Sequence, residues 1–151
     1  MDNRITKVWY LEMLSIKEFK PTIIPEEAIV IKQEKPSPNI NRFFYLEVGK
    51  NWRWKDRLEW SIDDWTKWVN RDGLSTWILI FDNIPAGYFE LNKLINGVEI
   101  AHFGLLPNFI GKGLGGGFLS VAIKEAWELG KKRVWVHTCS LDHPNALKNY
   151  K

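Results

Sequence analysis

Five glycines crowd the seven positions from 111 to 117, within the stretch FIGKGLGGGF. Glycine loses more backbone freedom on folding than any other residue, so such a dense cluster needs a reason. An apolar run precedes the cluster, and apolar residues at helical spacing follow it. The start of a helix exposes unpaired amides with a partial positive charge, and glycines let an anion approach them closely. The cluster therefore predicts a phosphate or pyrophosphate site; the alternative is a tight strand-to-helix turn without a ligand.

Two common phosphate-binding patterns match this cluster poorly. The P-loop pattern requires Ser or Thr after its Gly-Lys pair, whereas Lys112 is followed by Gly113. The dinucleotide pattern G-x-G-x-x-G is formally present as Gly111, Gly113 and Gly116. However, the residues PNFI separate it from the preceding strand, and little chain remains for the further strands of that fold. A dinucleotide-binding domain therefore stays an alternative.

Local patterns predict the elements that must position the cluster. A helix is expected from Asn39, as its cap, to Gly49, and a second after Ser61, where Asp64 completes a variant capping box. Apolar residues at four-residue spacing predict a third helix at 114–129, and HPNALKNYK predicts the start of a fourth. Strands are predicted at 6–14, 28–32, 74–81, 86–94, 98–106 and 133–138.

The order of these elements predicts an α/β fold in a single domain over residues 1–151. Short turns, DNIP and ING, make the three middle strands antiparallel neighbours. A helix joins strand 98–106 to strand 133–138, and this crossover requires the two strands to be parallel. The result is a mixed, mostly antiparallel central sheet flanked by helices. The glycine turn lies at the carboxyl end of a strand, where ligands of such sheets bind.

Composition narrows the function classes. The net charge is +3 and no block of five or six like charges occurs, so no nucleic-acid partner is expected. The single cysteine, Cys139, excludes an internal disulfide and fits a reducing compartment. No run approaches the ~20 apolar residues of a membrane span, and the N-terminus lacks a signal-peptide stretch. We therefore expect a soluble cytoplasmic domain. We also expect no metal, because His137, Cys139 and His143 do not match a zinc spacing.

The segment VEIAHFGLLPNFIGKGLGGGFLSVAIKEAWELGKKRVWVHT resembles motif A of the GNAT superfamily of acetyl-CoA-dependent N-acetyltransferases. That motif comprises a bulged strand, a Q/R-x-x-G-x-G/A loop, a helix and the next strand. Gly113 and Gly115 match its small positions, and Ile110 stands where the family prefers Gln or Arg. HPNALKNYK is similar to the following N-x-x-A-x-x-x-Y segment, with His143 in place of Asn. The whole chain resembles a bacterial subgroup with YLEM, DRLEWS, PAGYFEL and VWVHTCSLDHPNAL segments.

The resemblance implies acetyl-CoA as cosubstrate and two stretches that bind it. The strand end Phe103, Gly104 and Leu105 would pair with the pantetheine arm, and an amide near Leu105 would polarise the acetyl carbonyl. The two parallel strands would splay to admit the cofactor. The residues implied in cofactor binding beyond the strand end are Ile110, Gly111, Lys112, Gly113, Leu114, Gly115, Gly116 and His143.

Acetyl transfer from a thioester requires an unprotonated amine and a proton for the departing thiolate. Glu99 is the candidate base, because its spacing of fourteen residues before Gly113 is seen in family members that use a glutamate there. Its alternative role is a solvated strand carboxylate, and Glu90 is the alternate base. His102 could relay protons, but a packing role is favoured. Tyr150 is the candidate general acid, in register with the family motif.

Five tryptophans lie close together in sequence between positions 52 and 68, near Phe43, Phe44 and Tyr45. In the GNAT fold the early helices border the acceptor site, so an aromatic wall could hold a cationic amine. Core packing is favoured for most of these rings. The predicted function is direct N-acetylation of an amine of unknown identity; the alternative from another class is a CoA-binding module without catalysis.

The resemblance also implies strands after Tyr150, which this sequence does not contain. The predicted fold is therefore a GNAT-like fold truncated at its C-terminus. Strand 133–138 would then be left as an open edge, and open edges pair with other chains. We accordingly predict a homodimer or a larger assembly.

Overall fold

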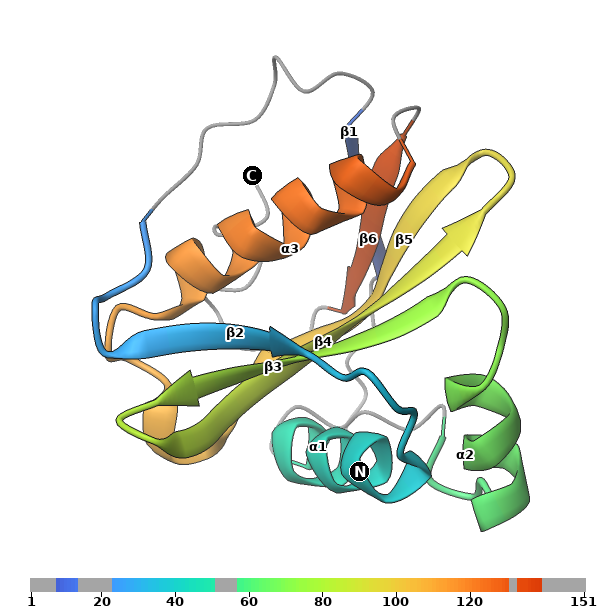
Figure 1. Cartoon of the computed structure of the whole chain (residues 1–151), viewed down its shortest axis with the longest axis horizontal. Helices are drawn as coiled ribbons and strands as arrows, with labels where there is room; N and C mark the ends of the chain where they lie inside the picture. The colour runs from blue at the N-terminus through green and yellow to red at the C-terminus, as the bar shows by residue number, and fades with distance from the viewer. Residues whose placement is uncertain (1–7, 14–22, 51–56, 131–132, 140–151) are drawn as a thin grey trace, which may run out of the picture.

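Six strands form one mixed sheet in the computed structural model, which describes residues 8–13, 23–50, 57–130 and 133–139. The strand order across the sheet is β1-β6-β5-β4-β3-β2, and only β5 and β6 pair in parallel. The predicted mixed, mostly antiparallel sheet is thus confirmed (Figure 1). The strands are β1 (Val8–Met13), β2 (Ala28–Lys32), β3 (Leu74–Phe81), β4 (Ile84–Leu94), β5 (Gly97–Leu105) and β6 (Val134–Cys139).

Helices cover both faces of the sheet (Figure 1). α1 (Pro38–Gly49) and α2 (Ile62–Val69) lie on one face, and α3 (Gly115–Leu129) lies on the other. A short 3-10 turn, η2 (Pro107–Phe109), connects β5 to the glycine cluster. No helix within the described residues is long and apolar enough to span a membrane.

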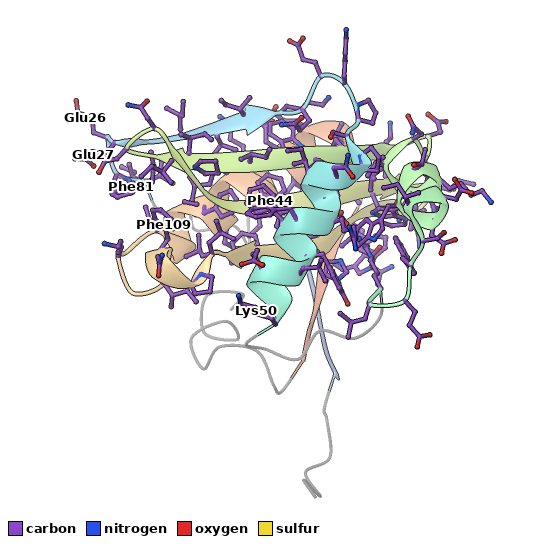
Figure 2. The ribbon with its side chains drawn as sticks, turned by 90° about the horizontal axis from the view of Figure 1, so that it is seen from below. Glu26, Glu27, Phe44, Lys50, Phe81 and Phe109 are labelled. Atoms are coloured by element: carbon purple, nitrogen blue, oxygen red, sulfur yellow. The ribbon has the colours of Figure 1, made fainter. Side chains whose placement is uncertain are left out.

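The central strand β4 is buried on both faces, and its alternation divides the core in two. Phe89 packs toward α3, where its ring centroid lies 5.3 Å from that of Phe118. Tyr88 faces the other way and stacks on Phe44 of α1, with ring centroids 5.1 Å apart. Figure 2 shows Phe44 on the side of α1 that meets the sheet. Glu90 follows Tyr88 by two residues and lies on the same face of β4. β4 therefore places a carboxylate in the interior, beneath α1 and α2.

The predicted N-terminal caps of α1 and α2 had different outcomes. The predicted capping box of α2 is confirmed, since Ser61 and Asp64 exchange both hydrogen bonds, at 2.9 and 3.2 Å. The predicted cap of α1 at Asn39 is wrong: Ser37 is the N-cap and Pro38 is the first helical residue. Proline suits that position because its fixed φ is helical and its missing N–H would have no partner there.

The turn between β3 and β4 follows the sequence prediction. Asp82 and Asn83 both have positive φ, 50° and 65°. Such a pair is typical of two-residue hairpin turns, and Asn and Asp tolerate this conformation better than other side chains. β4 consequently starts at Ile84, two residues before the predicted strand.

The outer edge of β6 is covered by the chain itself. β1 pairs antiparallel along β6 from Val8 opposite Cys139 to Met13 opposite Val134. The expectation of an open edge at strand 133–138 was therefore wrong, because a strand's partner cannot be deduced from its own residues. The homodimer stays a prediction, but the open edge no longer supports it.

Candidate functional site

The glycine turn has an open backbone. Gly111 and Gly113 adopt positive φ angles of 85° and 75°, which side chains rarely adopt. A Cβ atom built on either would meet nothing within 4 Å. These glycines are therefore required by conformation, and their exposed side remains open to a ligand.

The start of α3 fits an anion. Its N-cap, Leu114, makes no side-chain capping hydrogen bond, and no acidic residue lies in the first turn. The first amides of a helix point along its axis and carry partial positive charge. The turn and the helix start thus present backbone donors that match the predicted pyrophosphate cradle, which remains a prediction.

Gly117 has a different role from the rest of the cluster. A Cβ atom here would lie 2.5 Å from Cγ2 of Ile24 and 2.8 Å from its backbone nitrogen. The segment before β2 therefore passes directly against the first turn of α3. Local sequence could not show this contact, because the two residues are far apart in the chain.

The end of β5 has an edge without a strand beside it in the described part of the chain. The parallel register joins Val98–Ile100 to Val134–Val136, whereas β5 continues to Leu105. Phe103 and Leu105 turn their side chains toward the core beneath α3. Backbone groups of this stretch can therefore serve an extended ligand, as expected for a pantetheine arm.

Aromatic packing fixes the passage from β5 to the glycine turn. Phe109 of η2 meets Phe81 at the end of β3, with ring centroids 6.2 Å apart and the rings nearly perpendicular. Figure 2 shows the two rings together at one end of the sheet. The open turn is thus attached to a rigid support rather than to a free loop.

A polar row crosses the opposite face of the sheet, beneath α1 and α2. Glu90 and Asn92 of β4 lie opposite His102 and Glu99 of β5, respectively. The register shifts between these pairs, at a β-bulge. Glu99 is half-buried, and Asn92 donates from Nδ2 to its Oε1 over 3.5 Å. The side of the sheet on which Glu99 lies, which the sequence left open, is therefore the α1/α2 face.

Glu90 is fully buried and its carboxylate is held by three donors. Asn41 of α1 donates from Nδ2 to Oε2 over 2.7 Å, and Trp68 of α2 donates from Nε1 to Oε1 over 3.0 Å. Arg57 lies 3.0 and 3.2 Å from the two oxygens through Nη1. We call Glu90 with these three partners the Glu90 network.

The Glu90 network keeps the carboxylate ionised. Burial alone would raise the pKa of Glu90, but His102, the Arg57 charge and the Asn41 hydrogen bond together lower it to about 2. A carboxylate that is so weakly basic and so fully bonded is a poor proton acceptor near neutral pH. The alternate assignment of Glu90 as the base stays a prediction, and this arrangement argues against it.

The aromatic cluster encloses a cation that belongs to the chain itself. The Arg57 guanidinium carbon lies 4.5 Å from the Trp68 ring centroid, 4.7 Å from Trp60 and 5.3 Å from Trp65. The backbone N–H of Arg57 also donates to the Tyr45 hydroxyl over 2.9 Å. These rings therefore pack around Arg57 and do not form an empty cage for an amine. Trp52 and Trp54 lie outside the described residues.

His102 lies between the Glu90 network and the outside. Its Nδ1 is 3.8 Å from Oε1 of Glu90, and the Tyr45 ring meets its imidazole edge-on at 5.3 Å. Its side chain is 13% exposed, whereas that of Glu90 is 0% exposed. Sequence patterns could not predict this pairing, because the two residues meet only through the register of β4 and β5.

Tyr150 and His143 lie outside the described residues, and so does the helix predicted to carry Tyr150. Among the residues that are described, no group of three or more His, Cys, Asp or Glu side chains could hold a metal ion.

A parallel strand pair, an open glycine turn and a helix follow one another in this chain, and a known family shares this arrangement. The chain matches the model of the Acetyltransferase (GNAT) family over residues 39–151. The chain belongs to the GNAT acetyltransferase family. The alternative of a dinucleotide-binding domain is wrong, because the sheet is mostly antiparallel and that fold requires a parallel one.

Solved GNAT structures share this fold. A GCN5-related N-acetyltransferase from Kribbella flavida superposes with a TM-score of 0.61 at 14% identity, covering 88% of this chain and 50% of its own. An aminoglycoside acetyltransferase from an uncultured soil metagenomic sample gives 0.61 at 14%, with coverages of 82% and 85%. A mutant spermidine N-acetyltransferase from Vibrio cholerae gives 0.53 at 14%, with 72% and 67%. At these identities the likeness concerns the fold alone.

The chain spans about half the length of the Kribbella protein and of a tandem GNAT protein from the clavulanic acid biosynthesis pathway. No curated protein matches the chain.

Proposed function

We propose that this GNAT domain transfers an acetyl group from acetyl-CoA directly to an amine. The observation that carries the proposal is that consecutive backbone segments, from the end of β5 to the start of α3, are open to a ligand. Beyond Ile100, the edge of β5 that faces away from β4 has no strand beside it in the described residues, and this stretch leads through η2 into the positive-φ glycines and the uncapped start of α3. A ligand with an extended arm that ends in a pyrophosphate needs backbone groups that pair with the arm, followed by donors that bind the anion. This path offers both in that order.

Backbone groups would do most of the binding. Phe103, Gly104 and Leu105 would pair with the pantetheine arm, and an amide near Leu105 would polarise the acetyl carbonyl as in an oxyanion site. Side chains contribute little to such a site, so Ile110 can stand where the family prefers Gln or Arg. The stretch that would cradle the pyrophosphate comprises Ile110, Gly111, Lys112, Gly113, Leu114, Gly115 and Gly116, with His143 as a further contact.

Glu99 would accept a proton from the acceptor nitrogen. It is half-buried on the α1/α2 face and lies on the strand whose end would hold the thioester. Tyr150 would donate a proton to the departing thiolate. In this direct transfer, the amine nitrogen bonds to the carbonyl carbon as the carbon–sulfur bond breaks.

The cradle is tested by titration calorimetry with acetyl-CoA. Gly113→Asp places a negative charge beside the pyrophosphate, so we expect affinity to fall at least tenfold, which is about 1.4 kcal/mol. Gly113→Ala is the matched control, because it carries the same strain at positive φ without the charge. Equal affinities for wild type and Gly113→Asp would contradict the pyrophosphate assignment.

Catalysis is tested by thiol release from acetyl-CoA over a panel of amines. Sisomicin and spermidine are the first probes, because structural neighbours are an aminoglycoside acetyltransferase bound to sisomicin and a spermidine N-acetyltransferase. Glu99→Gln should lower turnover by about 10²-fold with little change in acetyl-CoA affinity. Glu47→Gln, at an exposed site on α1, is the matched control. Tight binding without release over the panel would favour a CoA-binding module instead.

A further inference from the structure

A hollow of about 520 Å³ lies along one side of α2, and none of its lining residues takes part in the proposed transfer. It is lined by Trp60, Asp64, Lys67, Trp68 and Arg71. Spacings of three and four residues relate the last four, so they share one side of the helix and of its continuation. The chemistry of the hollow is accordingly set by five side chains of one short segment.

Trp60 and Trp68 form a fixed aromatic corner in this hollow. Their ring centroids lie 6.1 Å apart, with the ring planes at 62°. Trp68 is held because its indole N–H donates to Oε1 of Glu90 over 3.0 Å, and Trp60 packs edge-on against Trp65 with centroids 4.8 Å apart. Both tryptophans are nevertheless only half-buried. Large rings that stay partly exposed and cannot turn away offer a pre-formed surface to a flat apolar group.

Two cations stand beside the aromatic corner. Lys67 and Arg71 are exposed and four residues apart, and neither makes an ion pair in the part of the chain that the structure describes. The guanidinium carbon of Arg71 lies 5.7 Å from the Trp68 ring centroid. Like charges one helical turn apart repel each other, so an anion placed between them would be stabilised by both.

The carboxylate that borders the hollow already has a partner. Oδ2 of Asp64 accepts the backbone N–H of Ser61 over 2.9 Å in the capping box, at the positive end of α2. The lining therefore combines two cations without an ion pair and one acid that the helix start compensates. A basic residue near a helix end needs no ligand, but two half-exposed tryptophans held beside two such cations are typical of a binding site.

We propose that this hollow binds a small molecule in which an anionic group is attached to a flat aromatic ring. The ring would lie against Trp60 and Trp68, and the anion would contact Lys67 and Arg71. A carboxylate and a phosphate present similar oxygens to such a pair of cations, so both belong to this ligand class. The proposal does not depend on acetyl transfer, because it rests on other residues.

Titration calorimetry at pH 7 tests the site with indole-3-acetate as the carboxylate and adenosine monophosphate as the phosphate. Indole, adenosine and tryptamine are the matched probes, because they keep a ring but lack the anion. We expect at least one of the two anions to bind about tenfold more tightly than its uncharged counterpart, and to bind more weakly as salt is added. Failure of both anions to bind at millimolar concentration would overturn the proposal. Binding of tryptamine as tight as that of the anions would overturn it too.

Variants then assign the binding to this hollow. Lys67→Gln and Arg71→Gln each remove one charge at an exposed position, so we expect each to lower the affinity for the anion about threefold and the pair about tenfold. Lys124→Gln, exposed on α3, is the matched control and should bind as wild type does. The indole N–H signal of Trp60, assigned with Trp60→Phe, should shift when the anion binds. Unchanged affinity in the double variant, or a Trp60 signal that does not move, would contradict the proposed site.

Discussion

The glycine turn and the Glu90 network differ in the groups from which they are built. The glycine turn and the strand end that precedes it offer backbone groups, and their open space comes from missing side chains. The Glu90 network consists of side chains from four separate segments, and aromatic rings pack around its Arg57. A backbone site tolerates side-chain changes unless they fill it. A buried charge network tolerates few, because each partner compensates the burial of another.

The largest expected effect comes from breaking the Glu90 network. Glu90→Gln leaves the Arg57 charge buried without its counterion, so we expect the free energy of unfolding to fall by about 3–5 kcal/mol. Glu47→Gln is the matched control, because Glu47 pairs over 3.3 Å with Lys50, which Figure 2 shows at the end of α1. Exposed pairs contribute about 0–1 kcal/mol. Urea unfolding measures both, and equal losses in the two variants would show that the buried pair does not differ from the surface pair.

Acid should weaken the network without mutation. Folding lowers the pKa of Glu90 from 4.5 to about 2. A lowered carboxyl pKa contributes stability that is fully present above the unfolded value and is lost as the pH falls through the folded value. The stability difference between wild type and Glu90→Gln should therefore shrink, by on the order of 3 kcal/mol, from pH 4.5 to pH 2. Thermal unfolding across this range would test it, and a difference independent of pH would refute it.

The smallest expected effect separates packing from binding within the glycine cluster. Gly117→Ala forces its Cβ against Ile24, and overpacking of this kind costs about 1–3 kcal/mol. Gly113→Ala meets no neighbour and has only the strain of its positive φ, about 1 kcal/mol. We expect Gly117→Ala to lower stability while acetyl-CoA affinity in calorimetry stays unchanged. A loss of affinity that exceeds the loss of stability would place Gly117 in the cradle as well.

Features that depend on neighbouring residues could be predicted from the sequence. Ser61 and Asp64 lie three residues apart, so their capping box is visible in a single turn of chain. The crossover helix required β5 and β6 to be parallel, and that is what is observed. The open turn followed from the density of glycines alone.

The Glu90 network could not be predicted, because its contacts join distant positions. Asn41 and Arg57 lie 49 and 33 residues from Glu90, and no periodic pattern relates such separations. One signal was present: an acidic residue within the apolar run of GYFEL implies a buried partner. The bulge that turns His102 and Glu99 to one face has no signature in their own residues, so the relation between them required the register of β4 and β5.

The pairing of β1 with β6 also has a consequence for synthesis on the ribosome. β1 and β2 are consecutive in the chain but lie at opposite edges of the sheet. Val8 pairs with Cys139, so the first strand leaves the ribosome long before its partner has been made. Closing so long a loop costs entropy that later contacts must offset, and high contact order slows folding. Strands β2 to β5 can assemble as hairpins during translation, whereas the first strand to be synthesised must be among the last to dock.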